Sequence, residues 1–127
     1  MDIEGAEYEV LTFEDSDVLA SFSTMTIEFH GLTAMFDKEF LRMISGIFEK
    51  IYKNFSICHV HPNNCCPVVS LFGIEIPDVI EVTFIKNDFL PIVLNNSRVH
   101  LPHQLDRKNV EKNTDFVMPK IWWDSTI

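Results

Sequence analysis

The chain opens with Met-Asp-Ile-Glu-Gly-Ala-Glu-Tyr-Glu-Val-Leu (residues 1–11). This stretch predicts the end of a strand that is cut off at its front, followed by the acids Asp2 and Glu4. Gly5 permits a tight turn, and residues 6–11 begin a helix whose positive end lies close to the acids. Open α/β sheets place their functional residues in such loops, at the carboxyl ends of parallel strands. We therefore predict an α/β fold with its functional site beside Asp2 and Glu4.

The hydrophobic pattern predicts further strands and one long helix. Residues 23–29 and 55–60 are rich in apolar and β-branched side chains, which predicts strands that end at His30 and His61. Residues 79–85 predict a closing strand, and residues 68–72 are a candidate for a short one. Residues 37–55 predict a helix because apolar side chains recur every three or four positions.

We expect the first three strands to be parallel. The closing strand is expected to be antiparallel, because no helix connects it to the strand before it. The predicted fold is thus α/β: part of a Rossmann-like, mostly parallel sheet with an antiparallel closing strand and helices on its faces. We assign residues 1–90 to this domain and residues 91–127 to an irregular tail that wraps it, because no period holds beyond residue 86. The expected apolar anchors of the tail are Phe89, Leu90, Phe116, Trp122 and Trp123.

Composition and charge exclude several classes of partner. Nineteen acidic and ten basic residues give a net charge of −9, whereas nucleic acids and anionic membranes are bound by clustered Lys and Arg. No apolar stretch approaches the roughly 18–20 residues of a membrane span, and residues 1–11 lack the features of a signal peptide. The three cysteines are odd in number and closely spaced, which favours reduced thiols over a disulfide framework. We therefore expect a cytoplasmic protein without nucleic-acid or membrane partners.

Several motifs resemble one known family. Residues 2–11 (Asp-Ile-Glu-Gly-Ala-Glu-Tyr-Glu-Val-Leu) resemble the central motif of the FkbM family of S-adenosylmethionine-dependent methyltransferases. Residues 27–30 (Ile-Glu-Phe-His) look like that family's next strand, and residues 59–64 and 76–84 look like its closing pair. The resemblance covers roughly residues 1–90 in the family's order. It implies an O-methyltransferase that uses S-adenosylmethionine and acts on a hydroxyl group of a sugar, lipid or natural product.

The predicted topology brings polar side chains from three strand ends to one edge of the sheet, with Asp78 nearby. A histidine there can take the proton of a substrate hydroxyl at neutral pH, and a carboxylate can orient the imidazole. A small hydroxyl-bearing molecule is therefore the predicted partner. The candidates are Asp2, His30 and His61 for catalysis, Asp2 and Glu4 for the cofactor that the resemblance implies, and Glu28, Asn63 and Asn64 for the substrate.

These candidates have structural alternatives. Asp2 and Glu4 could cap the helix that follows them. His30 could be an ordinary hydrogen-bonded histidine at a strand end. Asn63 and Asn64 could be turn residues and nothing more.

Two histidines and two cysteines also lie close together in the sequence. We expect His59 and His61 to point to opposite faces of their strand, so that only His61, beside the turn at residues 62–64, joins the site. A zinc site built from His59, His61, Cys65 and Cys66 is a third hypothesis. Its spacing matches no ordinary structural zinc site, so no metal is assigned.

One part of the family pattern is absent from the sequence. The four glycines are too far apart to form the glycine-rich loop that cradles S-adenosylmethionine, which puts cofactor binding by this chain alone in doubt. The chain would then be the later half of a methyltransferase domain, and the alternative function is an inactive remnant that serves as a small interaction domain. In both cases the first strand would expose an unpaired edge, which predicts self-association or pairing with another chain.

Overall fold

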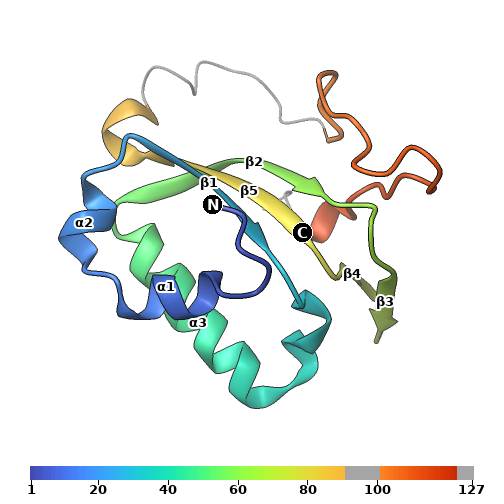
Figure 1. Ribbon diagram of the computed structural model, residues 1–127, viewed down its shortest axis with the longest axis horizontal. Helices are drawn as coiled ribbons and strands as arrows, with labels where there is room; N and C mark the ends of the chain where they lie inside the picture. Colours follow the sequence, from blue (N-terminus) through green and yellow to red (C-terminus); the bar gives the residue numbers. More distant parts are fainter. Residues whose placement is uncertain (91–100, 123–127) are drawn as a thin grey trace.

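The computed structural model describes residues 1–90 and 101–122. Its centre is a three-stranded sheet in the order β1-β5-β2, and a hairpin of β3 and β4 lies at one end of it (Figure 1). The strands are β1 (Thr24–Phe29), β2 (Phe55–Pro62), β3 (Val68–Leu71), β4 (Ile74–Pro77) and β5 (Ile80–Lys86). The helices are α1 (Glu7–Phe13), α2 (Ser16–Ala20) and α3 (Lys38–Tyr52), with the 3₁₀ helices η1 (Leu32–Phe36), η2 (Asn87–Phe89) and η3 (Lys120–Trp122).

The predicted Rossmann-like, mostly parallel sheet is wrong. Every strand pair in the described part of the chain is antiparallel: β1 with β5, β2 with β5, and β3 with β4. The strand at residues 80–86 takes the central position, so it separates β1 from β2 and pairs with both. Its Ile80, Val82 and Phe84 are all buried, and a central strand satisfies its backbone hydrogen bonds on both sides. Since β1 and β2 are both antiparallel to β5, they run in the same direction, although they do not pair.

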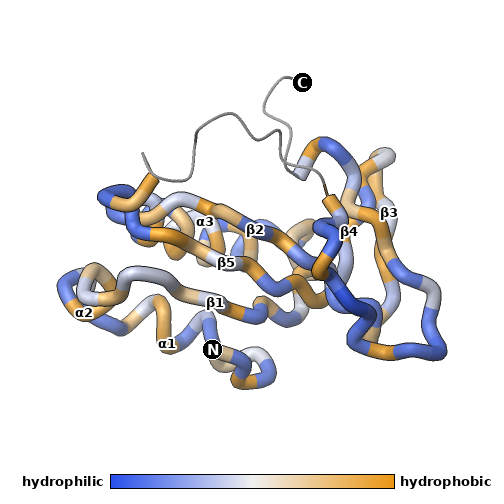
Figure 2. The backbone as a smooth tube through the Cα atoms, turned by 90° about the horizontal axis from the view of Figure 1, so that it is seen from above, coloured by the Kyte–Doolittle hydropathy of each residue, from blue (hydrophilic) through white to orange (hydrophobic). Residues whose placement is uncertain are grey.

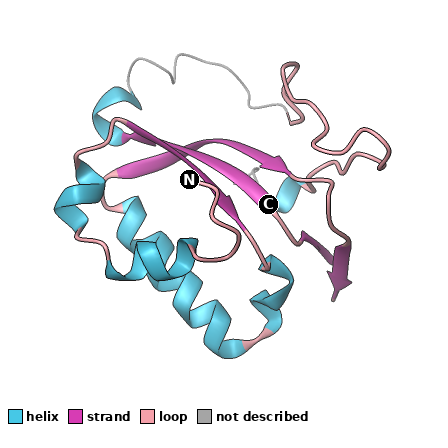
Figure 3. Cartoon of the chain, in the orientation of Figure 1, coloured by secondary structure: helices cyan, strands magenta, loops and turns pink. Residues whose placement is uncertain are grey.

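The core lies between one face of the sheet and helices α1 and α3 (Figures 1 and 3). Burial alternates at the start of β5, where Ile80 and Val82 are buried and Glu81 between them is exposed; Figure 2 colours this strand by hydropathy. The predicted helix at residues 37–55 is confirmed but shorter, because Phe55 begins β2 and is buried there. Asp37 caps α3 by accepting hydrogen bonds from the backbone N–H groups of Glu39 and Phe40.

Residues 1–3 form no strand, and residues 4–6 form a turn. Glu4 (φ 55°) and Gly5 (φ 99°) adopt left-handed backbone conformations, so the predicted tight turn at Gly5 is confirmed. Met1 nevertheless pairs with β1, because its amino group donates to the carbonyl of Thr26 and its carbonyl accepts from the N–H of Glu28. The N-terminal strand that was expected to expose an unpaired edge is thus not formed, and self-association or pairing with another chain stays a prediction.

Residues 101–113 lie on the face of the sheet opposite the helices (Figure 1). The buried side chain of Asn64 attaches this segment: its oxygen accepts from Val110 N–H and its nitrogen donates to Val110 O. Phe116 and Trp122 pack against the core, as predicted, whereas Phe89 is 40% exposed. Trp123 lies outside the described residues. No helix within residues 1–90 and 101–122 combines the length and apolar character required to cross a membrane.

Candidate functional site

A buried glutamate holds the imidazole of His30. Glu7 is the first residue of α1, and its side chain is fully buried. Its carboxylate accepts hydrogen bonds from the backbone N–H groups of Gly5 (2.9 Å) and His30 (2.7 Å). The same carboxylate lies 3.2 Å from Nδ1 of His30. Glu7 therefore connects the turn, the start of α1 and the end of β1, and it fixes the orientation of the His30 ring.

Three further carboxylates surround the other ring nitrogen of His30. Nε2 lies 3.7 Å from Glu4, 3.9 Å from Asp2 and 3.9 Å from Glu28. Asp2 and Glu4 reach it from the N-terminal turn, whereas Glu28 is on β1. Asn63, which directly follows β2, donates a hydrogen bond of 2.7 Å to Glu28. We call Asp2, Glu4, Glu7, Glu28, His30 and Asn63 the His30 site.

The arrangement suits acid–base chemistry on a polar ligand. With Nδ1–H directed at Glu7, the neutral imidazole presents the lone pair of Nε2 to the surface, and the His30 side chain is 18% exposed. When Nε2 takes a proton, the resulting imidazolium lies close to four carboxylates. Asp2, Glu28 and His30 also offer ligand atoms that lie within 4.8 Å of one another, so they could hold a cation instead.

The structure thus brings together five of the predicted residues: Asp2, Glu4, Glu28, His30 and Asn63. His61 lies across β5 from Glu28, because both pair with Glu81, and its ring contacts residues of the 101–113 segment instead. Asn64 is likewise used to attach that segment.

Glu7 is the residue of the His30 site that the sequence did not single out. Its position at the start of a helix predicts a favourable interaction with the helix dipole and exposure to solvent. The one available signal is the spacing: Glu7 follows Gly5 by two residues, so a left-handed turn can direct its carboxylate back onto the turn's N–H groups. In the folded chain, the end of β1 brings the backbone N–H and the ring of His30 against this buried carboxylate.

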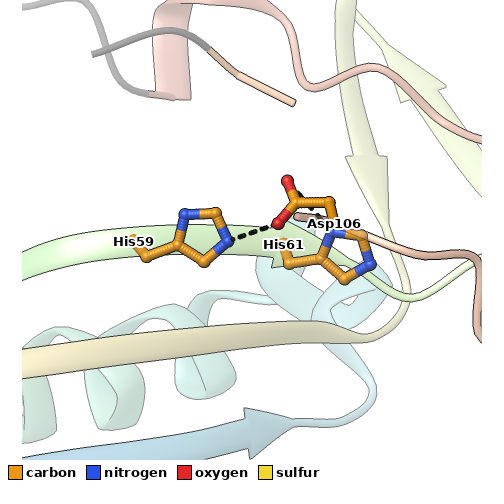
Figure 4. A group of neighbouring side chains, drawn as sticks. All are labelled: His59, His61 and Asp106. Carbon is orange, nitrogen blue, oxygen red and sulfur yellow. Dashed lines mark ion pairs between the residues drawn. The ribbon is translucent and has the colours of Figure 1, made fainter. Parts of the chain in front are cut away.

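His59, His61 and Asp106 form a second cluster (Figure 4). The prediction that the two histidines point to opposite faces is wrong, because residues two apart on a strand share a face. Their rings are stacked at an interplanar angle of 12°, with centroids 6.5 Å apart. Asp106 Oδ1 lies 3.0 Å from His59 Nε2, and Asp106 Oδ2 lies 3.6 Å from His61 Nδ1.

The cysteines are not part of this cluster. Cys65 and Cys66 are free thiols whose sulfur atoms lie 2.9 Å apart. Loss of hydration, the hydrogen bond with Cys66 and the negative charges of Cys66 and Glu28 raise the pKa of the Cys65 thiol to about 12. Cys65 is therefore protonated at neutral pH and is a poor nucleophile there.

A hydrogen bond from Tyr8 connects α1 to the end of β1. The Tyr8 hydroxyl group donates a hydrogen bond of 2.6 Å to the carbonyl of His30. Burial, together with the negative charges of Glu7 and Asp78, raises the pKa of Tyr8 well above its ordinary value. The hydroxyl therefore stays protonated in the folded state at alkaline pH.

This raised pKa predicts alkaline instability. Between pH 10 and the pKa of folded Tyr8, the unfolded chain loses a proton that the folded chain keeps, so the free energy of unfolding falls by about 1.4 kcal/mol per pH unit. Below pH 10 both states are protonated, and Tyr8 contributes no pH dependence. Urea unfolding of wild type and Tyr8→Phe between pH 9 and about pH 11.5 measures the effect. If the free energy of unfolding fell equally steeply with pH in Tyr8→Phe and in wild type, the prediction would be contradicted. Tyr52→Phe is the comparison, because burial also raises the pKa of Tyr52.

Comparison with protein-family models, with curated proteins and with solved structures gives no match to this chain. The resemblance to the FkbM family therefore stays a prediction from the sequence motifs.

Proposed function

We propose that this chain binds a small polar molecule at the His30 site and removes a proton from one of its hydroxyl groups. This is the acceptor side of an O-methyltransferase reaction of the FkbM kind. The observation that carries the proposal is the pairing of a fully buried Glu7 with Nδ1 of His30, which leaves Nε2 directed at the surface among Asp2, Glu4 and Glu28.

Each group has a use in this reaction. The substrate hydroxyl donates its hydrogen bond to Nε2 of His30, and the proton moves to that nitrogen as the oxygen becomes nucleophilic. Glu7 stabilises the imidazolium that forms, and the nearby carboxylates add to this stabilisation. Glu28 can accept hydrogen bonds from neighbouring hydroxyl groups, and Asn63 can donate hydrogen bonds to them. This favours a sugar or another polyol over a simple alcohol.

The methyl donor is assigned by the resemblance alone. S-adenosylmethionine would supply the electrophilic methyl group, and Asp2 and Glu4 are the residues proposed to contact it. Gly5, Gly31, Gly46 and Gly73 are spread along the chain, so the sequence offers no glycine-rich loop that would cradle it. Asp2 and Glu4 instead face His30. We therefore assign no methyl-transfer step to these residues.

We also place the protein in the cytoplasm. Cys58, Cys65 and Cys66 are all free, and Cys65 and Cys66 are adjacent thiols that a reducing compartment preserves.

A ligand titration tests the proposed function. We expect sugars or polyols to shift the imidazole NMR signals of His30, because a hydroxyl group would bind at Nε2. His30→Gln should weaken this binding at least about tenfold, which corresponds to about 1.4 kcal/mol and is within the range for the loss of one hydrogen bond. His103→Gln, at an exposed histidine, is the matched control and should bind as wild type does.

Two outcomes would contradict this proposal. Equal binding by His30→Gln and wild type would place the ligand elsewhere. If no member of a panel of monosaccharides and polyols shifts His30, the alternative function, a non-catalytic interaction domain, is favoured instead. Imidazole spectra also show whether neutral His30 carries its proton on Nδ1, as the contact with Glu7 requires.

A further inference from the structure

We infer that His59, His61 and Asp106 form a binding site for a divalent transition-metal ion, separate from the His30 site. All three side chains offer ligand atoms that lie within 4.8 Å of one another. Figure 4 shows both imidazoles beside the Asp106 carboxylate, which comes from the segment that covers β2. The inference does not depend on the proposed function of His30.

The hydrogen bonding of His61 is the first argument. Its Nε2 lies 3.0 Å from the carbonyl oxygen of Arg107, which can only accept, so Nε2 carries the proton. In the neutral ring Nδ1 then has a free lone pair. Within residues 1–90 and 101–122, this buried Nδ1 has no hydrogen-bond partner. Metal-binding histidines characteristically donate their other N–H to a backbone carbonyl in this way.

The position of Asp106 is the second argument. Its Oδ2 faces Nδ1 of His61 at 3.6 Å, which is too long for a hydrogen bond. A carboxylate oxygen and an imidazole lone pair repel each other unless a metal ion or a proton lies between them. The backbone N–H of His103 donates a hydrogen bond of 2.6 Å to Oδ2, and this holds the carboxylate in place. Both Asp106 and His61 side chains are only 12% exposed, so water screens the repulsion poorly.

The distances fit a small ion. Zinc at about 2.0–2.1 Å from its ligands separates neighbouring ligand atoms by roughly 3.3 Å. The observed separations are 3.0 Å from His59 Nε2 to Asp106 Oδ1 and 3.6 Å from His61 Nδ1 to Asp106 Oδ2. Both separations lie close to the value for zinc, and one ligand atom from each of the three residues lies within 4.8 Å of the others.

The ligand types select the metal class. Two imidazoles and one carboxylate suit Zn²⁺ or Fe²⁺, whereas Ca²⁺ and Mg²⁺ require oxygen ligands. Three protein ligands leave at least one coordination position open, as in catalytic rather than structural zinc sites. His59 and His61 come from β2, whereas Asp106 comes from the covering segment, so the ion would also fasten that segment to the sheet.

Zinc titration of metal-free protein tests the inference. Calorimetry should show one Zn²⁺ bound per chain, and saturating zinc should raise the Tm because binding to the folded state stabilises it. His61→Gln and Asp106→Asn should each weaken binding by at least about a hundredfold, more than the roughly 10–100-fold that loss of an outer-shell partner costs. His103→Gln, whose side chain lies nearby but is not a ligand, is the matched control. The Tm of each metal-free variant shows that it folds.

Further variants test whether zinc binds instead at the cysteines or at the His30 site. Cys65→Ser/Cys66→Ser should bind zinc as wild type does, and Co²⁺ in the site should show no thiolate charge-transfer absorption. The inference would be overturned if the double cysteine variant lost zinc binding. It would also be overturned if His30→Gln lost zinc binding while His61→Gln bound zinc as wild type does. The inference would likewise be overturned if wild-type protein bound no zinc. A proton on Nδ1 of His61, rather than a metal ion, would then lie between His61 and Asp106. If His61→Gln or Asp106→Asn fails to fold, His59→Gln replaces it in the titration and should likewise weaken zinc binding.

Discussion

Phe84→Ala is expected to lower the free energy of unfolding by about 3–5 kcal/mol, a large share of the roughly 5–15 kcal/mol that stabilises a domain. Phe84 is fully buried on the central strand β5. Its ring packs against Phe29 of β1 and Phe48 of α3, at centroid distances of 6.5 Å and 6.0 Å. The substitution therefore leaves a cavity where the two layers meet, and neighbouring side chains can fill it only in part.

Urea unfolding followed by circular dichroism measures this loss. Phe13→Ala is the matched control, because Phe13 is 82% exposed on α1 and its replacement should change stability by less than about 0.5 kcal/mol. Similar unfolding midpoints for the two variants would contradict the central position of β5.

Glu7→Ala is expected to destabilise the protein by about 3 kcal/mol, because it removes a fully buried acceptor and each buried donor left unsatisfied costs about 1–3 kcal/mol. The substitution leaves the backbone N–H of His30 without its acceptor and leaves Nδ1 of His30 without its partner. Because Glu7 is fully buried, added salt should change the loss little.

Two further variants sharpen this test. Glu7→Gln retains an acceptor oxygen, so it should cost less stability, but the imidazole NMR signals of His30 should no longer show a single tautomer. Glu9→Ala, on the exposed side of the same helix, should leave both stability and tautomer unchanged. A Glu7→Ala protein as stable as Glu9→Ala would mean that Glu7 does not anchor His30.

Local patterns predicted much of the His30 site. Acids next to a left-handed glycine turn, and a histidine directly after a buried strand, are visible in the sequence because turn chemistry and burial period are local properties. Glu28, His30 and Asn63 meet because β1 and β2 run in the same direction and end on the same side, whereas Asp2 and Glu4 reach His30 from the N-terminal turn. That part of the prediction did not require the correct strand pairing.

The role of His61 could not be predicted locally. Its hydrogen-bond acceptor Arg107 and its neighbour Asp106 follow it by more than forty residues, in a segment without periodic pattern. Nothing near Asp106 in the sequence distinguishes it from the other acids of this acidic chain. The prediction that separated His59 from His61 was wrong for a simpler reason, since side chains on a strand repeat every second residue.

The sequence by itself determined where the helix α3 and the strands β1, β2 and β5 lie, because apolar periodicity and capping residues act over a few positions. Only the tertiary structure decided that β5 lies between β1 and β2, that Glu7 is buried under His30, and that Asp106 meets two histidines of β2. Each of these depends on which surfaces far apart in the chain bury one another, and that choice is made by the free energy of the whole fold rather than by any short stretch of it.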